Sequence, residues 1–255
     1  MSNVRNRYIA PIVGLLLFFG TWEALVRLFG IRPFVLARPS RIVQYLAKFP
    51  DDYFRAGLIT MKHASLGFAI AILVALVVGA AMAASNFVEH ATQPVLTLIA
   101  VTPFAAYIAS VKIGLGLFSD KPVVFIVALV SLPAFAFASA DGMRGADPST
   151  RELLASVNAS RWEVLWHLRL PSALPSLFTA AKYNTGLALI VAYLAESGTG
   201  GLGEIGNRAI AGNQGDRLWA AILSMALLGT ITLVLLNMLQ RAAMGWHVSQ
   251  RTQQG

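Results

Sequence analysis

The chain has no cysteine and few charged residues, and both absences limit what the protein can be. Without cysteine it has no disulfide framework, no thiolate nucleophile and no cysteine-ligated metal cluster. Charged residues make up 13% of the 255 residues, whereas soluble domains usually carry about 25%. Hydrophobic residues make up 56%. This balance indicates that lipid, rather than water, covers much of the protein surface.

Several kinds of site are missing as well. The net charge is +8, but no basic run is long enough to follow a nucleic-acid backbone. No GxxxxGK[ST] motif is present, so the chain has no Walker-type ATP site of its own. The histidines show no metal-ligand spacing such as HExxH. An intramembrane serine hydrolase would need a histidine in a facing span, and none lies within apolar stretches such as 66–84. We therefore predict no catalytic residue and no metal site.

What the sequence has instead is a series of long apolar runs. A helix needs about 20 mainly apolar residues to cross the hydrocarbon core of a membrane. The first run is too long for the apolar core of a signal peptide, so we interpret it as a retained helix. The sequence predicts an all-α polytopic membrane protein, a single domain over residues 1–255, with six spans near 8–30, 58–84, 92–111, 122–140, 177–197 and 218–240.

The orientation of these spans is not set by charge. Six spans place both termini on one side. If that side is the cytoplasm, the inside segments carry eight Lys and Arg residues and the outside segments carry ten, so the positive-inside rule gives no support. Between the first two spans, residues 38–49 form an amphipathic helical pattern. Two interpretations of it remain open, a helix at the membrane interface and a solvated loop helix.

One polar stretch interrupts the chain between the fourth and fifth spans. Asp147 followed by Pro148 is typical of a helix N-cap with proline at the first helical position. Ser149 and Glu152 have the spacing of a capping box. Asn158 follows one short helix, and asparagine is the residue, after glycine, that best tolerates the left-handed conformation that ends helices.

A second helix is predicted to begin directly after this turn, because Ser160 and Glu163 repeat the capping-box spacing. The stretch is then a helical hairpin outside the lipid, and Leu153, Leu154 and Val157 form an apolar patch on its first helix. Such a patch suits a helix that fills a groove on a partner protein. An ordinary interfacial loop is the alternative that the residues leave open.

The hairpin resembles the coupling loop, or EAA loop, of bacterial ABC importer permeases. That pattern is Glu-Ala-Ala, three residues, Gly, and a Leu-Pro about a dozen residues later. Here Glu152 matches the Glu, two leucines replace the alanines, Asn158 replaces the Gly, and Leu170-Pro171 supplies the Leu-Pro. "LARPSRIVQYL", "AESGTGGLG" and the Trp22-Glu23 pair resemble the nitrate/taurine/sulfonate branch of these permeases.

The resemblance implies a type I, MetI-like permease fold in the bacterial inner membrane. It implies cytoplasmic termini, a cytoplasmic coupling loop over 141–175, and docking through 148–163. The partners it implies are an ATP-binding cassette ATPase dimer that binds ATP and Mg, a second permease copy, an extracytoplasmic solute-binding protein and membrane lipid. No cofactor is expected on this chain. The expected coupling residues are Arg151, Glu152, Leu153, Leu154, Val157, Asn158, Ala159 and Ser160.

Five further residues are candidates for the translocation pathway. Pro103 is predicted to kink or open the third span, and Phe104 and Tyr107 follow it, as pathway or packing residues. Lys112 either attracts an anion at the outer mouth or anchors a helix end. Asn184 lies in the first half of the fifth span. Glu196, at the end of that span, has either a structural role or a contact with substrate.

The sequence thus predicts the permease subunit of an ATP-driven importer. The solutes carried within this branch are nitrate, taurine or sulfonates, bicarbonate and vitamin precursors, and the sequence does not select among them. The alternative is a secondary transporter or channel subunit that works alone. Such transporters usually carry charges near the membrane midplane for ion coupling, whereas charges here gather at the span ends.

Overall fold

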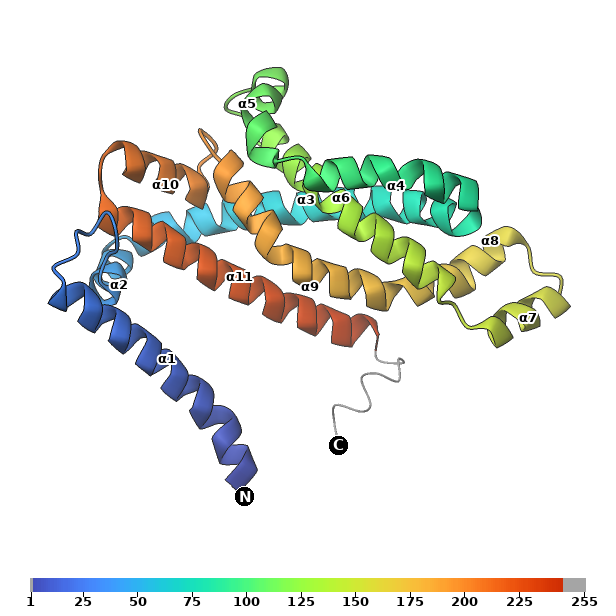
Figure 1. The fold of residues 1–255 in the computed structure, drawn as a ribbon, viewed down its shortest axis with the longest axis horizontal. Helices are drawn as coiled ribbons and strands as arrows, with labels where there is room; N and C mark the ends of the chain where they lie inside the picture. The colour runs from blue at the N-terminus through green and yellow to red at the C-terminus, as the bar shows by residue number, and fades with distance from the viewer. Residues whose placement is uncertain (1, 245–255) are drawn as a thin grey trace.

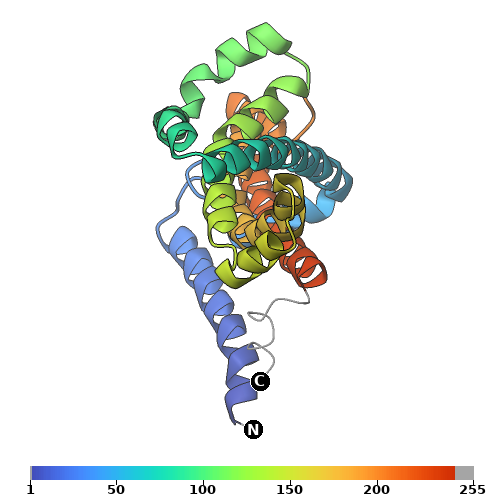
Figure 2. The ribbon, with the colours of Figure 1, turned by 90° about the vertical axis from the view of Figure 1, so that its right-hand side faces the viewer.

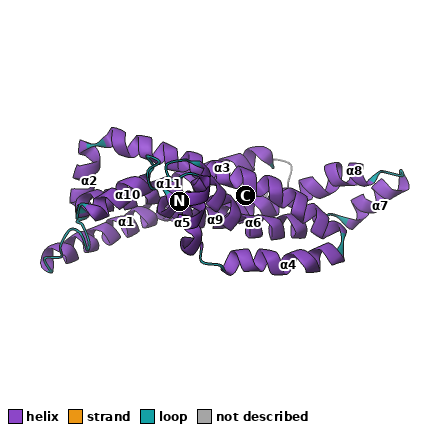
Figure 3. Ribbon diagram, turned by 90° about the horizontal axis from the view of Figure 1, so that it is seen from above, coloured by secondary structure: helices purple, strands orange, loops and turns teal. Residues whose placement is uncertain are grey.

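A computed structural model describes residues 2–244 of the chain, and helices connected by loops account for this part (Figure 1). The long axis has two distinct ends. Seen from above, α7 and α8 lie at one end and α2 and α10 at the other (Figure 3). The helices are α1 Ser2–Leu28, α2 Pro39–Lys48, α3 Pro50–Ala84, α4 Asn86–Val101, α5 Phe104–Leu115, α6 Lys121–Arg144, α7 Pro148–Ser156, α8 Arg161–Val164, the π-helical turn η1 Leu165–Arg169, α9 Leu170–Ala195, α10 Leu202–Ala211 and α11 Gly215–Ala243.

Five of the described helices are long and apolar enough to cross a membrane, and a bent pair supplies a sixth. The predicted spans correspond to α1, α3, α6, α9 and α11, and the bent pair is α4 with α5. The all-α class is confirmed. The second span, α3, begins eight residues before the expected position 58, so it includes polar residues that the apolar run excluded.

The third span is broken rather than continuous. α4 and α5 meet at an angle of 93°. Thr102 and Pro103 between them are extended, with ψ of 124° and 106°. Proline has no amide hydrogen for an i−4 carbonyl and disfavours helical geometry at the preceding residue. The kink or opening predicted at Pro103 is confirmed: the span expected near 92–111 consists of the two helices Asn86–Val101 and Phe104–Leu115. Figure 1 shows α5 rising away from the axis of α4.

The core of the bundle is formed by α3, α6 and α9, which pack closely because small residues lie between them. Gly67, Ala71, Ala75 and Gly79 are buried at four-residue intervals along α3. A Cβ atom at Gly67 would overlap Val127 of α6, and one at Gly79 would overlap Ser139. In a membrane, helices associate through such close backbone contacts, since apolar burial alone gives no advantage over lipid.

α1 stands apart from this core and is attached mainly at its end (Figure 2). Glu23 holds the attachment: its carboxylate pairs with Arg27 at 2.7 Å and accepts hydrogen bonds from the Ser40 amide at 3.0 Å and hydroxyl at 2.8 Å. Glu23 and Arg27 lie one helical turn apart, so their ion pair also stabilises α1. The added contact with Ser40 satisfies the start of α2, where helical amides lack partners.

α2 is the amphipathic helix predicted within 38–49. Ile42 is buried in a cluster that includes Ala56 of α3 and Ala220 of α11, whereas Val43 is 59% exposed. The helix therefore packs on the bundle with one face and leaves another uncovered. Packing of this face against other helices was not part of either interpretation of the sequence.

Candidate functional site

The first helix of the polar hairpin, α7, begins at a local capping signal. Asp147 is the N-cap of α7 and Pro148 its first residue, as predicted. The Asp147 carboxylate accepts hydrogen bonds from the Ser149 hydroxyl at 2.6 Å and from the Thr150 amide at 3.0 Å. The Ser149 and Thr150 hydrogen bonds lower the pKa of Asp147 to about 2. The capping box expected at Ser149 and Glu152 is wrong, because the Ser149 hydroxyl donates to Asp147 instead.

The turn of the hairpin has the conformation predicted for Asn158. Its φ is +57°, in the left-handed region. The amide of Asn158 donates to the Ala155 carbonyl at 3.0 Å, and that of Ala159 donates to the Leu154 carbonyl at 2.9 Å. These are the two hydrogen bonds of a Schellman motif, in which glycine or asparagine occupies the left-handed position. The turn is thus set by one residue.

The second helix begins with the capping box that its spacing predicted. The Ser160 side chain accepts from the Glu163 amide at 3.3 Å, and the Ser160 amide donates to the Glu163 carboxylate at 2.6 Å. α8 therefore begins directly after the turn, because only Ala159 lies between Asn158 and the N-cap residue Ser160. Asn158 therefore forms a rigid corner between the two helices.

The corner carries an uncovered apolar surface. No residue of α7 is buried, and Leu153 and Val157, one turn apart, are 64% and 68% exposed. Leu154 is half-buried, and Arg151, Glu152, Asn158 and Ser160 are exposed. α7 lies at the extreme end of the molecule (Figure 3). The hairpin therefore presents two adjacent apolar side chains beyond the bundle, which suits contact with another protein.

At the opposite end, Glu196 is fully buried in a hydrogen-bond network. Its carboxylate lies 2.7 Å from His63 Nδ1 and accepts hydrogen bonds from the Thr60 hydroxyl at 2.8 Å and the Gly203 amide at 3.0 Å. A buried carboxylate with this many partners holds its surroundings in one geometry. These contacts therefore favour a structural role for Glu196 over a contact with substrate.

The network continues to the surface through His63. His63 Nε2 lies 3.1 Å from Asp120, and Asp120 pairs with Lys62 at 2.7 Å. The Lys62 hydrogen bond, followed by that of His63, lowers the pKa of Asp120. The sequence predicts no role for His63, because the histidines show no metal-ligand spacing. Its helix starts at Pro50, and only the packing of α3 on the turn after α9 brings it to Glu196.

Lys112 is a second buried charge at this end. Its ammonium donates to the Ser197 carbonyl at 2.6 Å and lies 3.4 Å from that of Ala195. Cations are favourable at the carboxyl end of a helix, where carbonyl groups lack partners. These contacts favour the anchoring interpretation: Lys112 ties α5 to the end of α9.

The remaining pathway candidates lie within helix packing. Phe104 and Tyr107 pack on buried residues of α6 and α9. Asn184 is buried within α9, and its Nδ2 atom has no hydrogen-bond partner in the described part of the chain. The structure therefore brings Lys112 and Glu196 to one turn but gathers the five candidates into no common site.

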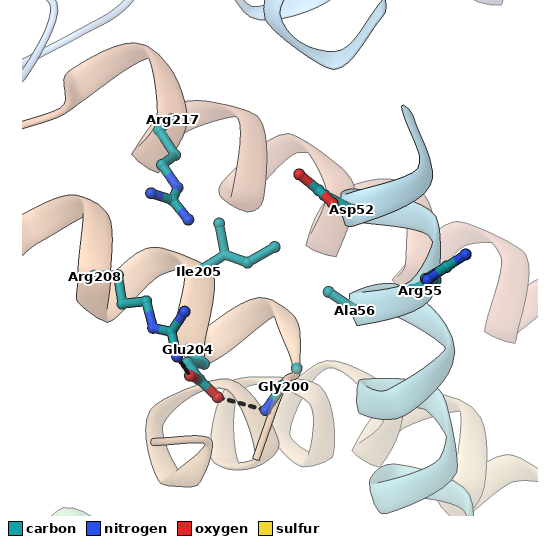
Figure 4. A pocket seen from close by; sticks show the side chains of 9 residues that line it. Asp52, Arg55, Ala56, Gly200, Glu204, Ile205, Arg208 and Arg217 are labelled. Carbon is teal, nitrogen blue, oxygen red and sulfur yellow. Dashed lines mark hydrogen bonds and ion pairs between the residues drawn. The ribbon is translucent and has the colours of Figure 1, made fainter. Parts of the chain in front are cut away.

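An arginine-containing cavity of about 320 Å³ lies at the α10 end (Figure 4). Arg208 of α10 and Arg217 of α11 reach into it, opposite Asp52 of α3. Arg208 forms an ion pair with Glu204, which also accepts from the Gly200 amide. Arg217 donates to the Gln214 side chain at 3.2 Å. Arg208 and Arg217 thus already have polar partners, whereas Arg55, which also lines the cavity, forms no ion pair among the described residues.

The comparisons with known proteins agree with this architecture. Residues 44–245 match the family model described as the binding-protein-dependent transport system inner membrane component. The chain is 25% identical to the formylaminopyrimidine transport permease protein ThiX of Halalkalibacterium halodurans, over 94% of this chain and 96% of that one. It is 26% identical to the taurine transport system permease protein TauC of Escherichia coli, over 89% and 85% of the two chains.

Solved structures show the same fold. An inward-facing MetNI methionine ABC transporter matches with a TM-score of 0.66 and 15% identity, over 75% of this chain and 95% of that one. A bacterial ABC transporter that imports alginate matches with a TM-score of 0.59 and 16% identity, over 94% and 97%. The fold is that of ABC importer permeases, which confirms the expected MetI-like class.

These findings define a membrane permease built around a bundle and an external hairpin. The chain belongs to the family of binding-protein-dependent transport system inner membrane components. It is a permease subunit of an ABC importer in the bacterial inner membrane, with several membrane-spanning helices. A secondary transporter or channel that works alone is not supported.

Proposed function

We propose that the α7–α8 hairpin docks in a groove of a separate ATP-binding cassette ATPase and transmits its closure to the spans. The observation that carries this proposal is the exposed pair Leu153 and Val157 on a helix with no buried residue. An apolar helix face in water is stabilised by a complementary groove. The Schellman corner at Asn158 supports the proposal, because a rigid hairpin moves as a unit.

The ATPase partner supplies the chemistry. ATP and Mg bind to that subunit, and this chain contributes no catalytic residue and holds no cofactor. The ATPase acts as a dimer, so one hairpin from each of two permease copies engages it. Closure of the ATPase dimer then shifts the permease pair between inward-open and outward-open states as a rigid-body movement.

A solute-binding protein delivers the solute at the α10 end, and the pathway lies between the two permease copies. We propose that the arginine-containing cavity, drawn in Figure 4, faces this protein in the assembly. Relatives are named for taurine, aliphatic sulfonates, nitrate and formylaminopyrimidine. We propose a small polar solute of these classes. A thermal-shift screen of the solute-binding protein encoded beside this gene identifies it, and a screen without any ligand from these classes contradicts the proposal.

The orientation follows from the docking proposal, because the hairpin must then face the cytoplasm. The chain has no native cysteine, so one introduced cysteine reports its own side of the membrane. Ser149→Cys is expected to react with an impermeant thiol reagent only after the cells are opened. Labelling of this variant in intact cells would overturn the orientation.

The docking proposal is tested with a matched pair of substitutions. Val157→Asp places a charge on the proposed docking face, whereas Val43→Asp places the same charge on α2 at the opposite end; both valines are exposed, at 68% and 59%. We expect Val157→Asp to abolish substrate-stimulated ATP hydrolysis in the reconstituted importer and Val43→Asp to preserve it. Equal stimulation in both variants contradicts docking through α7.

A further inference from the structure

A second cavity, of about 620 Å³, lies between the hairpin and the end of α3. Three arginines line it: Arg151 from α7, Arg161 from α8 and Arg169 from η1. No acidic side chain is among its lining residues. Within residues 2–244, none of these three arginines forms an ion pair or a side-chain hydrogen bond.

All three arginines of this cavity lack such partners, whereas at the α10 end Arg208 pairs with Glu204 and Arg217 bonds to Gln214. Three guanidinium groups around one cavity repel one another. An anion bound among them would replace this repulsion with attraction. Guanidinium groups bind phosphate with two parallel hydrogen bonds, the geometry that makes arginine common in phosphate sites. The cavity is therefore suited to bind a phosphate-like anion.

The cavity lies where two spans leave the membrane. Ala80 and Ala84, which line it, belong to the last turn and a half of α3, and Arg169 directly precedes the apolar helix α9. Trp162 also lines it and is 71% exposed. Tryptophan is enriched at the level of lipid headgroups. The depth of the cavity thus matches the headgroup layer of one leaflet.

The cavity does not compete with the proposed docking face. Successive residues of an α-helix are about 100° apart, so residues two apart lie on nearly opposite faces. Arg151 and Ala155 line the cavity, whereas Leu153 and Val157 are each two positions further along and point outward. One face of α7 serves the cavity, and the opposite face stays free for a protein partner.

We propose that this cavity binds the phosphate group of an anionic phospholipid in the leaflet at the α7–α8 end, and that the lipid braces the hairpin against α3. The π-helical turn Leu165–Arg169 contributes two lining residues, Leu165 and Arg169, and such turns occur often at functional sites. The assignment does not depend on which leaflet this is, so it stands apart from the docking proposal.

The test uses the full chain in nanodiscs of phosphatidylcholine, with and without phosphatidylglycerol. Native mass spectrometry measures the phosphatidylglycerol that stays bound to each permease. We expect Arg161→Gln and Arg169→Gln each to lower this affinity roughly fivefold, the usual contribution of one basic residue near an anionic membrane surface. Arg169→Lys keeps the charge but not the two parallel N–H donors of a guanidinium group, so it should retain only part of the binding, between that of the native protein and that of Arg169→Gln.

The control is Arg241→Gln in the last turn of α11, an exposed arginine that does not line the cavity. It is expected to leave phosphatidylglycerol binding unchanged. An equal loss in this control would show general surface attraction and overturn the site.

A second arm of the experiment adds free inorganic phosphate to nanodiscs of phosphatidylcholine alone. If it binds with the same dependence on Arg161 and Arg169, the site takes a soluble anion and the lipid assignment is wrong.

Discussion

Two sets of charged residues, at opposite ends of this permease, differ in burial and in pairing. At the α10 end, Glu196 and His63 are fully buried and bonded to each other. At the α7–α8 end, Arg151 and Arg161 are exposed and have no ion-pair partner among residues 2–244. A buried charge that lost its partner would be costly, so the first end is fixed. Unpaired surface charges and exposed apolar groups remain available for binding, so the second end is suited to the docking contact proposed above.

The contrast is sharpest for Glu196, where the largest effect is expected. Glu196→Ala removes the acceptor for Thr60, His63 and Gly203 at once. Breaking a buried charged pair typically costs about 3–5 kcal/mol. We expect a loss of stability of this order in thermal denaturation of the detergent-purified protein. Glu152→Ala, an exposed carboxylate at the other end, should change stability by less than about 0.5 kcal/mol. Similar losses in both variants would refute the contrast.

The fixed end also depends on close packing at Gly203. A Cβ atom there would overlap the carbonyl of Tyr193 and the side chain of Glu196. Overpacking of this kind costs about 1–3 kcal/mol, so Gly203→Ala should lower the denaturation midpoint. Gly186 of α9 has open space around it, and Gly186→Ala should raise stability by up to about 1 kcal/mol, since alanine favours a helix. The opposite order of the two midpoints would contradict the packing described.

At the other end, the expected effect is on partner binding rather than on the bundle. Glycine adopts the conformation of Asn158 at no steric cost, whereas a β-branched residue is crowded there, and the left-handed conformation costs ordinary residues about 1–2 kcal/mol. We expect Asn158→Gly to keep the amount of copurified ATPase and Asn158→Val to reduce it, per permease in the membrane. Equal recovery with both variants would show that the left-handed turn does not matter for assembly.

The smallest effect concerns Asp147. Its folded pKa is lowered from 3.8 to about 2, so its contribution to the stability of α7 is complete above pH 4 and is lost as the pH falls through 2. Hydrogen exchange of the first amides of α7 should therefore be insensitive to Asp147 protonation between pH 7 and pH 5. Asp147→Ala should speed this exchange, and Asp147→Ser should not, because serine also caps helices. Equal exchange in both variants would exclude the cap.

The same contrast explains what the sequence predicts and what it does not. The hairpin depends on local interactions within a few residues, such as the Asp147 cap, the Asn158 turn and the Ser160 box, so its spacing predicts it. Ser149 is the exception, because a nearer acceptor, Asp147, takes its hydroxyl. The spans follow from apolar length, although the size of the break at Pro103 depends on how α5 packs.

The network at the α10 end has no local signal. Its hydrogen bond between His63 and Glu196 joins residues 133 positions apart. Glu196 lies in the stretch "AESGTGGLG", but His63 lies in no motif. Glu196 itself was a candidate because it is acidic at a helix end. Its partner His63 was missed because a single histidine within the predicted span 58–84 belongs to no pattern, and only tertiary packing places the two together.

The central claim is that α7 touches the ATPase, and a cross-link tests it most directly. Because the chain has no native cysteine, Val157→Cys and Val43→Cys each offer a single reactive position. The assembled importer is treated with a short lysine-to-cysteine cross-linker, and the products are identified by mass spectrometry. The account predicts a permease–ATPase product for Val157→Cys and none for Val43→Cys. A product from Val43→Cys, with none from Val157→Cys, would contradict it.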